Sequence, residues 1–199
     1  MKQFKFILAV FAFGFFLSSC CNRNTEQQKN DPFTPPSIPP SPVTAIGDYL
    51  GTEICKLLAS GDVCIPMCCV VFTDKSDSSD ILVWGDWWVF NYNLVGDTLK
   101  TISGGNYPGL FHVRKIGDEY TVISFEQVED GAGYEASARR IFGEHYDVFQ
   151  KKHSDSEQRE INRSFDIASY LEKHQDIRAT YYQDYGWPAV EIPVESYLQ

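Results

Sequence analysis

The sequence lacks the short motifs that mark several common kinds of catalytic and nucleotide-binding site. It has no pair of histidines at metal-ligand spacing, no Gly-x-Ser-x-Gly elbow, and no glycine-rich loop between a predicted strand and a predicted helix. These absences argue against a zinc enzyme, a serine enzyme of the nucleophile-elbow type and a phosphate-cradling loop. We therefore expect neither a metal ion nor a cofactor.

Positive charge is scarce as well. The 199 residues include 17 Lys and Arg against 27 Asp and Glu, which leaves a formal net charge of −10 at pH 7. A nucleic-acid partner needs a basic face that displaces counterions from phosphate, so no nucleic acid is expected. With 43% hydrophobic residues the composition is that of a globular protein, and the length is that of one domain with appendages.

Long apolar runs are also missing. The run Phe6–Leu17 holds about 12 residues, whereas a helix needs about 20 to cross the hydrocarbon core of a bilayer. Lys2 and Lys5 precede this run, and the small residues Ser18 and Ser19 follow it. A positive start, a short apolar run and small residues, in this order, predict a signal peptide over residues 1–19.

The segment Leu17-Ser18-Ser19-Cys20 resembles the lipobox of bacterial lipoproteins. The resemblance implies cleavage before Cys20 and lipidation of that residue, palmitate included; a plain secretory signal with a coincidental cysteine is the alternative. Cleavage removes Lys2 and Lys5, so acyl chains rather than charge would hold the acidic chain at a membrane. Because Asn22-Arg23-Asn24 is not an acidic surface-export signal, we expect the cell envelope, at the periplasmic face of the outer membrane.

Residues 20–43 predict a tether, and residues 44–199 a single globular domain. Residues 21–30 are polar without apolar periodicity, and six of the ten prolines follow, at positions Pro32, Pro35, Pro36, Pro39, Pro40 and Pro42. Proline fixes φ and lacks an N–H group, so this stretch can enter neither a helix interior nor a sheet interior. An extended spacer of about 3 Å per residue is expected.

The domain begins with a predicted helix and continues with predicted strands. Apolar spacing predicts a helix over 44–59 and a strand over 63–72 that is interrupted near Pro66. Aromatic and β-branched runs predict four further strands, over 81–94, 98–103, 110–115 and 120–126. A type II turn at Pro108-Gly109 and a hairpin around Gly117-Asp118 would connect them as a four-stranded antiparallel meander.

Helical spacing returns after the meander. It predicts a helix over 136–149, and a capping box at Ser154-Asp155-Ser156-Glu157 opens another helix. The second helix is expected to bury Ile161, Phe165, Ala168 and Leu171. A last strand is expected over 177–183. The order predicts an α+β fold in which a curved antiparallel meander packs against helices.

Several motifs of this domain are similar to those of a group of small bacterial lipoproteins. They are the block 83–93, Gly96-Asp97-Thr98-Leu99, Ser103-Gly104-Gly105, Tyr107-Pro108-Gly109, Val128-Glu129-Asp130-Gly131 and Tyr185-Gly186-Trp187-Pro188. The meander, from about residue 81 to 130, also resembles the far end of the NTF2/cystatin-like fold. The resemblance implies a bent sheet that wraps a helix and leaves a conical cavity. That superfamily contains both enzymes and inert binding modules.

One strand carries the candidate site residues. Alternation places a set of side chains on one face of the predicted strand 81–94: Leu82, Trp84, Asp86, Trp88, Phe90 and Tyr92. Asp86 would be desolvated among these rings, which suits a general base; alternatively it caps backbone N–H groups at a bulge or reaches solvent. Trp84, Trp88 and Tyr92 are candidates for binding a small apolar or glycan-like ligand, and are otherwise core.

Histidines and cysteines complete the candidates. His112, on the predicted strand 110–115, is the expected acid–base partner of Asp86 or is simply hydrogen-bonded within the sheet. The other histidines are expected to be solvated: His145, His153 and His174. A disulfide is expected from Cys55 to Cys64 or Cys68, with buried free thiols as the alternative. The spacing of Cys64, Cys68 and Cys69 is not that of a metal site.

These observations predict a membrane-anchored exported lipoprotein whose domain binds a small ligand or an envelope protein without catalysis. The alternative is an enzyme of the ketosteroid-isomerase type, in which Asp86 is the general base and His112 or Tyr92 polarises the substrate. A structural envelope lipoprotein with a filled cavity is the third hypothesis. The sequence names no specific ligand.

Overall fold

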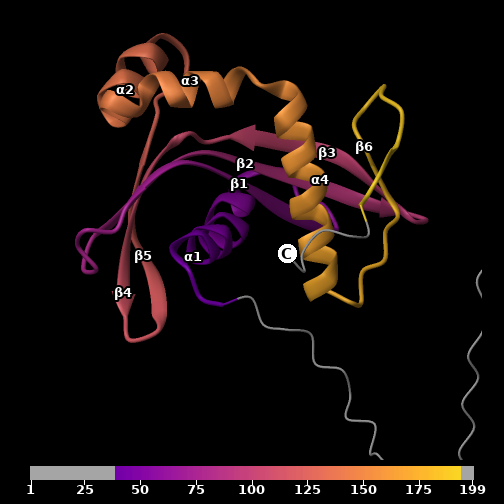
Figure 1. Cartoon of the computed structure of the whole chain (residues 1–199). Helices are drawn as coiled ribbons and strands as arrows, with labels where there is room; N and C mark the ends of the chain where they lie inside the picture. The colour runs from indigo at the N-terminus through magenta and orange to yellow at the C-terminus, as the bar shows by residue number, and fades with distance from the viewer. Residues whose placement is uncertain (1–38, 194–199) are drawn as a thin grey trace, which may run out of the picture. The chain divides into compact units, whose positions relative to one another are not determined.

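Residues 39–193 are described by a computed structural model of this chain. They form an α+β fold in which helices cover both faces of a curved, mostly antiparallel sheet of seven strands (Figure 1). The predicted signal peptide, Cys20 and most of the predicted tether lie outside these residues. Within residues 39–193, no helix is both long enough and apolar enough to cross a membrane.

The domain begins with three consecutive helical segments. These are α1 (Pro42–Tyr49), the π-helical turn η1 (Leu50–Ile54) and the 3-10 turn η2 (Cys55–Leu57). Ser41 caps α1, since its hydroxyl oxygen accepts a hydrogen bond from the Thr44 N–H at 3.1 Å. Pro42 occupies the first helical position, where no N–H is needed. The helix predicted over 44–59 is confirmed in part: it starts two residues earlier, is α-helical only as far as Tyr49 and ends at Leu57.

The strands are arranged around β2 (Ile81–Val95), which is 15 residues long. The other strands are β1 (Val63–Asp74), β3 (Thr98–Asn106), β4 (Gly109–Ile116), β5 (Glu119–Gln127), β6 (Tyr181–Gln183) and β7 (Val190–Glu191). β1 pairs along one edge of β2, while β4 and β3 share the other edge one after the other. β3 and β4 therefore do not pair with each other, and the predicted meander order is wrong, because a strand of this length accommodates two shorter partners on one edge.

Two predictions about prolines of the sheet region are wrong. Pro66 does not interrupt β1 and stands opposite Val89; β1 pairs only with β2 in the described residues, and an edge strand tolerates the missing donor. The irregularity of β1 lies instead between Val70 and Phe72. Gly109 is not among the glycines with positive φ, so the expected type II turn is not formed. The hairpin between β4 and β5 is confirmed, with Gly117 at φ 62°.

The helices after the sheet are α2 (Tyr134–Phe142), α3 (Tyr146–Ser154) and α4 (Ser156–Lys173). The single helix predicted over 136–149 is broken, because Gly143 adopts a φ of 51° that few other residues tolerate. Asp155 rather than Ser154 caps α4, and its carboxylate accepts a hydrogen bond from the Gln158 N–H at 3.0 Å. A short carboxylate therefore supplies the cap that we expected from a hydroxyl.

The predicted buried face of α4 is partly wrong. Arg163 and Ile167 are buried, whereas Ile161 and Phe165 are 42% and 37% exposed. Ala168 and Leu171 pack at the margin of the same core cluster as Ile167. The buried face of α4 therefore includes the charged Arg163 and is not a purely apolar stripe. The predicted last strand is shortened to β6, which runs parallel to β3.

Alternation along β2 divides the core between the two faces of the sheet. Val83, Trp87 and Val89 pack with Ile46 and Leu50 on the side of α1. On the other side, Leu82 and Trp84 pack with α2 and α3, and Tyr92 packs with α4. The rings of Trp88 and Phe90 stack on this second side at 6.0 Å. The predicted face of the strand is thus confirmed, and α2 to α4 cover the side that carries Asp86.

Candidate functional site

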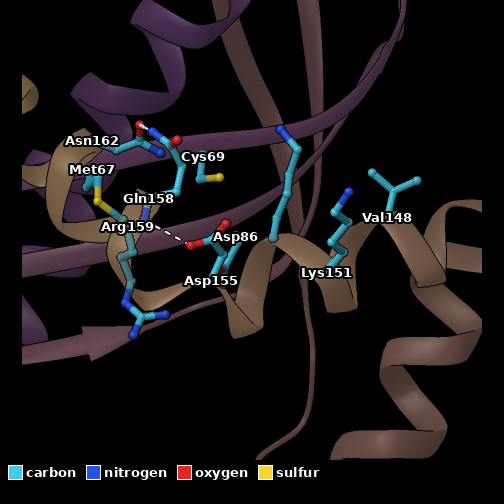
Figure 2. A pocket seen from close by; sticks show the side chains of 10 residues that line it. Met67, Cys69, Asp86, Val148, Lys151, Asp155, Gln158, Arg159 and Asn162 are labelled. Carbon is cyan, nitrogen blue, oxygen red and sulfur yellow. Dashed lines mark hydrogen bonds between the residues drawn. The ribbon is translucent and has the colours of Figure 1, made fainter.

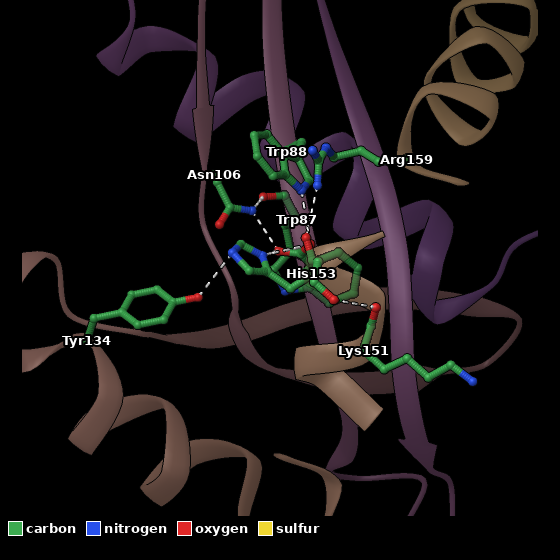
Figure 3. A network of polar contacts seen from close by, with 9 residues as sticks. Trp87, Trp88, Asn106, Tyr134, Lys151, His153 and Arg159 are labelled. Carbon is green, nitrogen blue, oxygen red and sulfur yellow. Dashed lines mark hydrogen bonds and ion pairs between the residues drawn. The ribbon is translucent and has the colours of Figure 1, made fainter. Parts of the chain in front are cut away.

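Asp86 is the centre of a buried polar cluster and is only 2% exposed. Asn106 Nδ2 donates to its Oδ1 at 2.6 Å, and Trp88 Nε1 donates to its Oδ2 at 3.1 Å. His153 Nδ1 lies 3.2 Å from Oδ2 (Figure 3). Donors of this kind replace the water that a buried carboxylate loses. Because these partners come from β3, β2 and α3, the Asp86 carboxylate connects the helical layer to the sheet.

His153 extends this cluster to α2. Its other ring nitrogen, Nε2, lies 3.4 Å from the hydroxyl of Tyr134 (Figure 3). When Nδ1–H donates to Asp86, Nε2 of a neutral ring accepts from that hydroxyl. Burial, followed by the nearby charge of Asp86, raises the pKa of Tyr134 to about 12. The prediction that His153 is solvated is wrong, since its side chain is 30% exposed and sits between two partners.

The two groups expected to polarise a substrate do not lie beside Asp86. β4 pairs only with residues 81–85 of β2, so His112 stands opposite Leu82, and its Nδ1 lies 2.8 Å from Asp80 Oδ1. Tyr92 is fully buried, and its hydroxyl accepts from Arg163 Nε at 2.9 Å. Burial raises the pKa of Tyr92 well above its usual range. The expected pairing of His112 with Asp86 is wrong, because His153 occupies that place.

Arg163 forms a second buried cluster, which the sequence analysis missed. Its guanidinium donates to both carboxylate oxygens of Asp184 at 2.8 Å and to Thr101 Oγ1 at 2.6 Å. It lies 3.9 Å from the ring centre of Phe90. Hydrogen bonds from Arg163 hold the pKa of Asp184 below its usual range. This cluster joins α4, β3 and the turn after β6, and its groups satisfy one another.

The aromatic side chains expected to line an open concavity make specific contacts within the domain. Trp84 Nε1 donates to the Ile141 carbonyl at 2.8 Å, and its ring packs against His145. The guanidinium of Arg159 lies over Trp88, 4.9 Å from the ring centre. Tyr92 lies in the core, as described above. Each of these three side chains therefore packs against other parts of the domain. His145, expected to be solvated, stacks on Phe72 at 4.0 Å.

An open cavity of about 500 Å³ lies next to the Asp86 cluster, between β1 and β2 on one side and the α3–α4 corner on the other (Figure 2). It is lined by Met67, Cys69, Asp86, Val148, Lys151, Lys152, Asp155, Gln158, Arg159 and Asn162. Seven of these ten side chains are polar or charged, and none of them is aromatic. The cavity therefore lacks the aromatic lining that the sequence predicted.

Two cationic side chains around this cavity have neutral partners rather than carboxylate partners. Lys152 Nζ donates to the Val70 carbonyl at 2.8 Å, and Arg159 Nη1 donates to the His153 carbonyl at 2.9 Å. Neither these two cations nor Lys151 forms an ion pair with a carboxylate in the described part of the chain. The two carboxylates of the lining are already engaged, Asp86 by its donors and Asp155 by the cap of α4.

The cysteines of the domain have different surroundings. Cys55 and Cys64 form a disulfide that ties η2 to β1, which is one of the two expected pairings. Cys68 and Cys69 are free thiols. Burial raises the pKa of both, so neither is poised as a thiolate nucleophile. Among residues 39–193, no three side chains of the metal-binding types gather to hold an ion.

In the part of the chain described here, groups that can act on a partner molecule are concentrated in the cavity rather than in the buried clusters. The Asp86 and Arg163 clusters use their polar atoms internally, whereas the cavity exposes cationic side chains to solvent. No family model matches this chain, and no curated protein and no solved structure matches it either.

Proposed function

We propose that this protein is a membrane-anchored exported lipoprotein whose globular domain binds a small ligand without converting it. The open cavity of about 500 Å³ at the α3–α4 corner carries the binding part of this proposal. Cavities of this size enclose small organic molecules in many proteins. All but Asp155 of the side chains around it come from β1, β2, α3 and α4, so packed elements would position the ligand.

The location is proposed from the sequence. A signal peptide over 1–19, lipidation at Cys20 and a proline-rich tether over 20–43 would place the domain at the periplasmic face of the outer membrane. The chain's net charge of −10 supports an acyl anchor, because an acidic protein is not attracted to anionic lipid. An NTF2/cystatin-like cone remains our fold proposal, and the packing of α1 against β1, β4 and β5 on one side of the sheet supports it.

The isomerase-type alternative has less support. Asp86 already accepts hydrogen bonds from Trp88 and Asn106 and lies against His153. His112 and Tyr92, the groups named to polarise a substrate, lie in other parts of the fold. A purely structural lipoprotein is supported less than a binding protein, because the cavity is open.

Native mass spectrometry of the full chain, exported through its own signal and extracted in detergent, tests the binding function. We expect a small mass to co-purify with the protein. Val148→Trp is the matched control, since Val148 lines the cavity while 46% exposed, and an indole there fills the cavity without entering the core. A bare protein that also gains no thermal stability from a panel of small molecules would contradict the proposal.

The anchor is tested on the same sample. Digestion and mass analysis are expected to find an N-terminal peptide that begins at Cys20 and carries acyl chains. Cys20→Ala should abolish acylation and release the protein from the membrane fraction. A peptide that begins elsewhere and carries no lipid would exclude the lipoprotein part of the proposal and leave the ligand cavity unaffected.

A further inference from the structure

We infer that the cavity at the α3–α4 corner selects a small anion with at least two negative groups, held between the lysines of α3 and Arg159 of α4. This inference rests on the proposed binding function and adds the class of ligand to it. Three observations carry it: unpaired cations, their placement around the cavity, and carboxylates that are already engaged.

Within the described residues, the cations of the cavity form a group without carboxylate partners. Some cations elsewhere in the domain do pair, such as Arg139 with Glu135 and Arg163 with Asp184. Lys151, Lys152 and Arg159 form no such ion pair in residues 39–193 and line one cavity together. Unpaired charges of one sign around a concave site concentrate the local potential and attract an ion of the opposite sign.

The side chains are placed to meet separate parts of a ligand. Figure 2 shows the side chain of Lys151, from α3, on one side of the cavity and the guanidinium of Arg159, from α4, on the other. Arg159 is oriented by two contacts, a hydrogen bond to the His153 carbonyl and the ring of Trp88 beneath it. A guanidinium held in this way keeps further N–H groups for a carboxylate or phosphate. A ligand that satisfies both sides needs two anionic groups.

The acidic side chains of the cavity do not favour a cation. Asp86 is buried and engaged by Trp88, Asn106 and His153. Asp155 accepts the hydrogen bond that caps α4. Both carboxylates therefore have partners already, whereas the three cations have only neutral carbonyl groups, a ring or solvent.

Isothermal titration calorimetry on the full lipidated chain in detergent tests the class of ligand. Citrate and inorganic pyrophosphate are the probes, and triethyl citrate is the uncharged control for citrate. We expect both anions to bind, with affinity that falls as salt is added, and triethyl citrate not to bind. Arg159→Gln and Lys151→Gln should each weaken binding about tenfold. Lys75→Gln, an exposed lysine of the β1–β2 loop, should leave binding unchanged.

The source of the anion is tested with vesicles of phosphatidylcholine containing cardiolipin, whose headgroup carries two phosphates. Vesicle binding that is lost in Arg159→Gln, without binding of citrate or pyrophosphate, assigns the anion to a lipid headgroup; binding of the soluble probes assigns it to a soluble molecule. A neutral co-purified ligand, held equally by Arg159→Gln and Lys151→Gln, would overturn the inference and leave the binding function intact. If the binding function itself is wrong, no small molecule co-purifies with the protein, and Val148→Trp changes nothing in its mass spectrum.

Discussion

His153 Nδ1 lies 3.2 Å from Asp86 Oδ2, although the two residues are 67 positions apart in the chain. The contact joins the last turn of α3 to the centre of β2. Asp86 also lines the cavity, and the His153 carbonyl orients Arg159. The same contact therefore contributes to the stability of the domain and to the shape of the proposed binding site.

Asp86→Asn should destabilise the domain by about 2 to 4 kcal/mol. The amide places a donor where Trp88, Asn106 and His153 require an acceptor, and the site is only 2% exposed. Urea unfolding measures the loss. Asp80→Asn is the control, because Asp80 also contacts a histidine but its side chain is 48% exposed, so little change is expected. Equal losses in the two variants would show that Asp86 is not the centre of a buried cluster.

Arg163→Met should cost about 3 to 5 kcal/mol, because it leaves Asp184 and the buried hydroxyl of Tyr92 without their donor. The effect should concentrate at β6, whose amide hydrogens we expect to exchange faster in hydrogen–deuterium exchange. Arg139→Met removes an exposed ion pair with Glu135 and should change little. Unchanged exchange at β6 in Arg163→Met would contradict the role of this cluster in holding β6 against β3.

Asp166 makes stability depend on pH. Burial raises its pKa from 3.8 to about 7, while the hydrogen bond from the Cys68 N–H and the charge of Lys173 oppose this shift. The folded state therefore holds a proton that the unfolded state has lost between about pH 4 and pH 7. The contribution of Asp166 to the free energy of unfolding therefore falls as pH rises through that window and is constant above it.

Asp166→Asn should remove this dependence and stabilise the domain at pH 8 by at most about 4 kcal/mol, with little effect near pH 4. Urea unfolding at the two pH values measures the difference. Asp118→Asn, in the exposed β4–β5 turn, is the matched control and should leave the pH profile unchanged. A profile for Asp166→Asn that parallels the unsubstituted protein would contradict the assignment.

The disulfide between Cys55 and Cys64 closes a short loop, with a sequence separation of 9, and its removal should cost about 2 to 3 kcal/mol. The double substitution to Ser, compared with the unsubstituted protein in thermal unfolding, measures this loss. Alkylation of the folded protein should label Cys69, which lines the cavity, before Cys68. Alkylation of Cys55 or Cys64 without a reductant would show that the bond is absent.

Local pattern was enough to predict much of the fold. Apolar spacing and turn chemistry within short windows predicted the first helix from residue 44, the long strand over 81–94 with its two faces and the hairpin at Gly117. The α+β class follows from the order of these segments. The predicted lipid anchor at Cys20 also depends on local pattern alone and remains a prediction.

Only the tertiary structure decided which distant segments meet. Nothing local reveals that β3 and β4 share one edge of β2, because strand pairing depends on the edges that remain free. A polar or charged side chain on a helix is expected to face solvent. Arg163 and His153 instead point into the domain, because each has a partner in another segment. Burial of a polar group becomes favourable only when such partners are in place, and the folded chain, not the sequence pattern, brings them together.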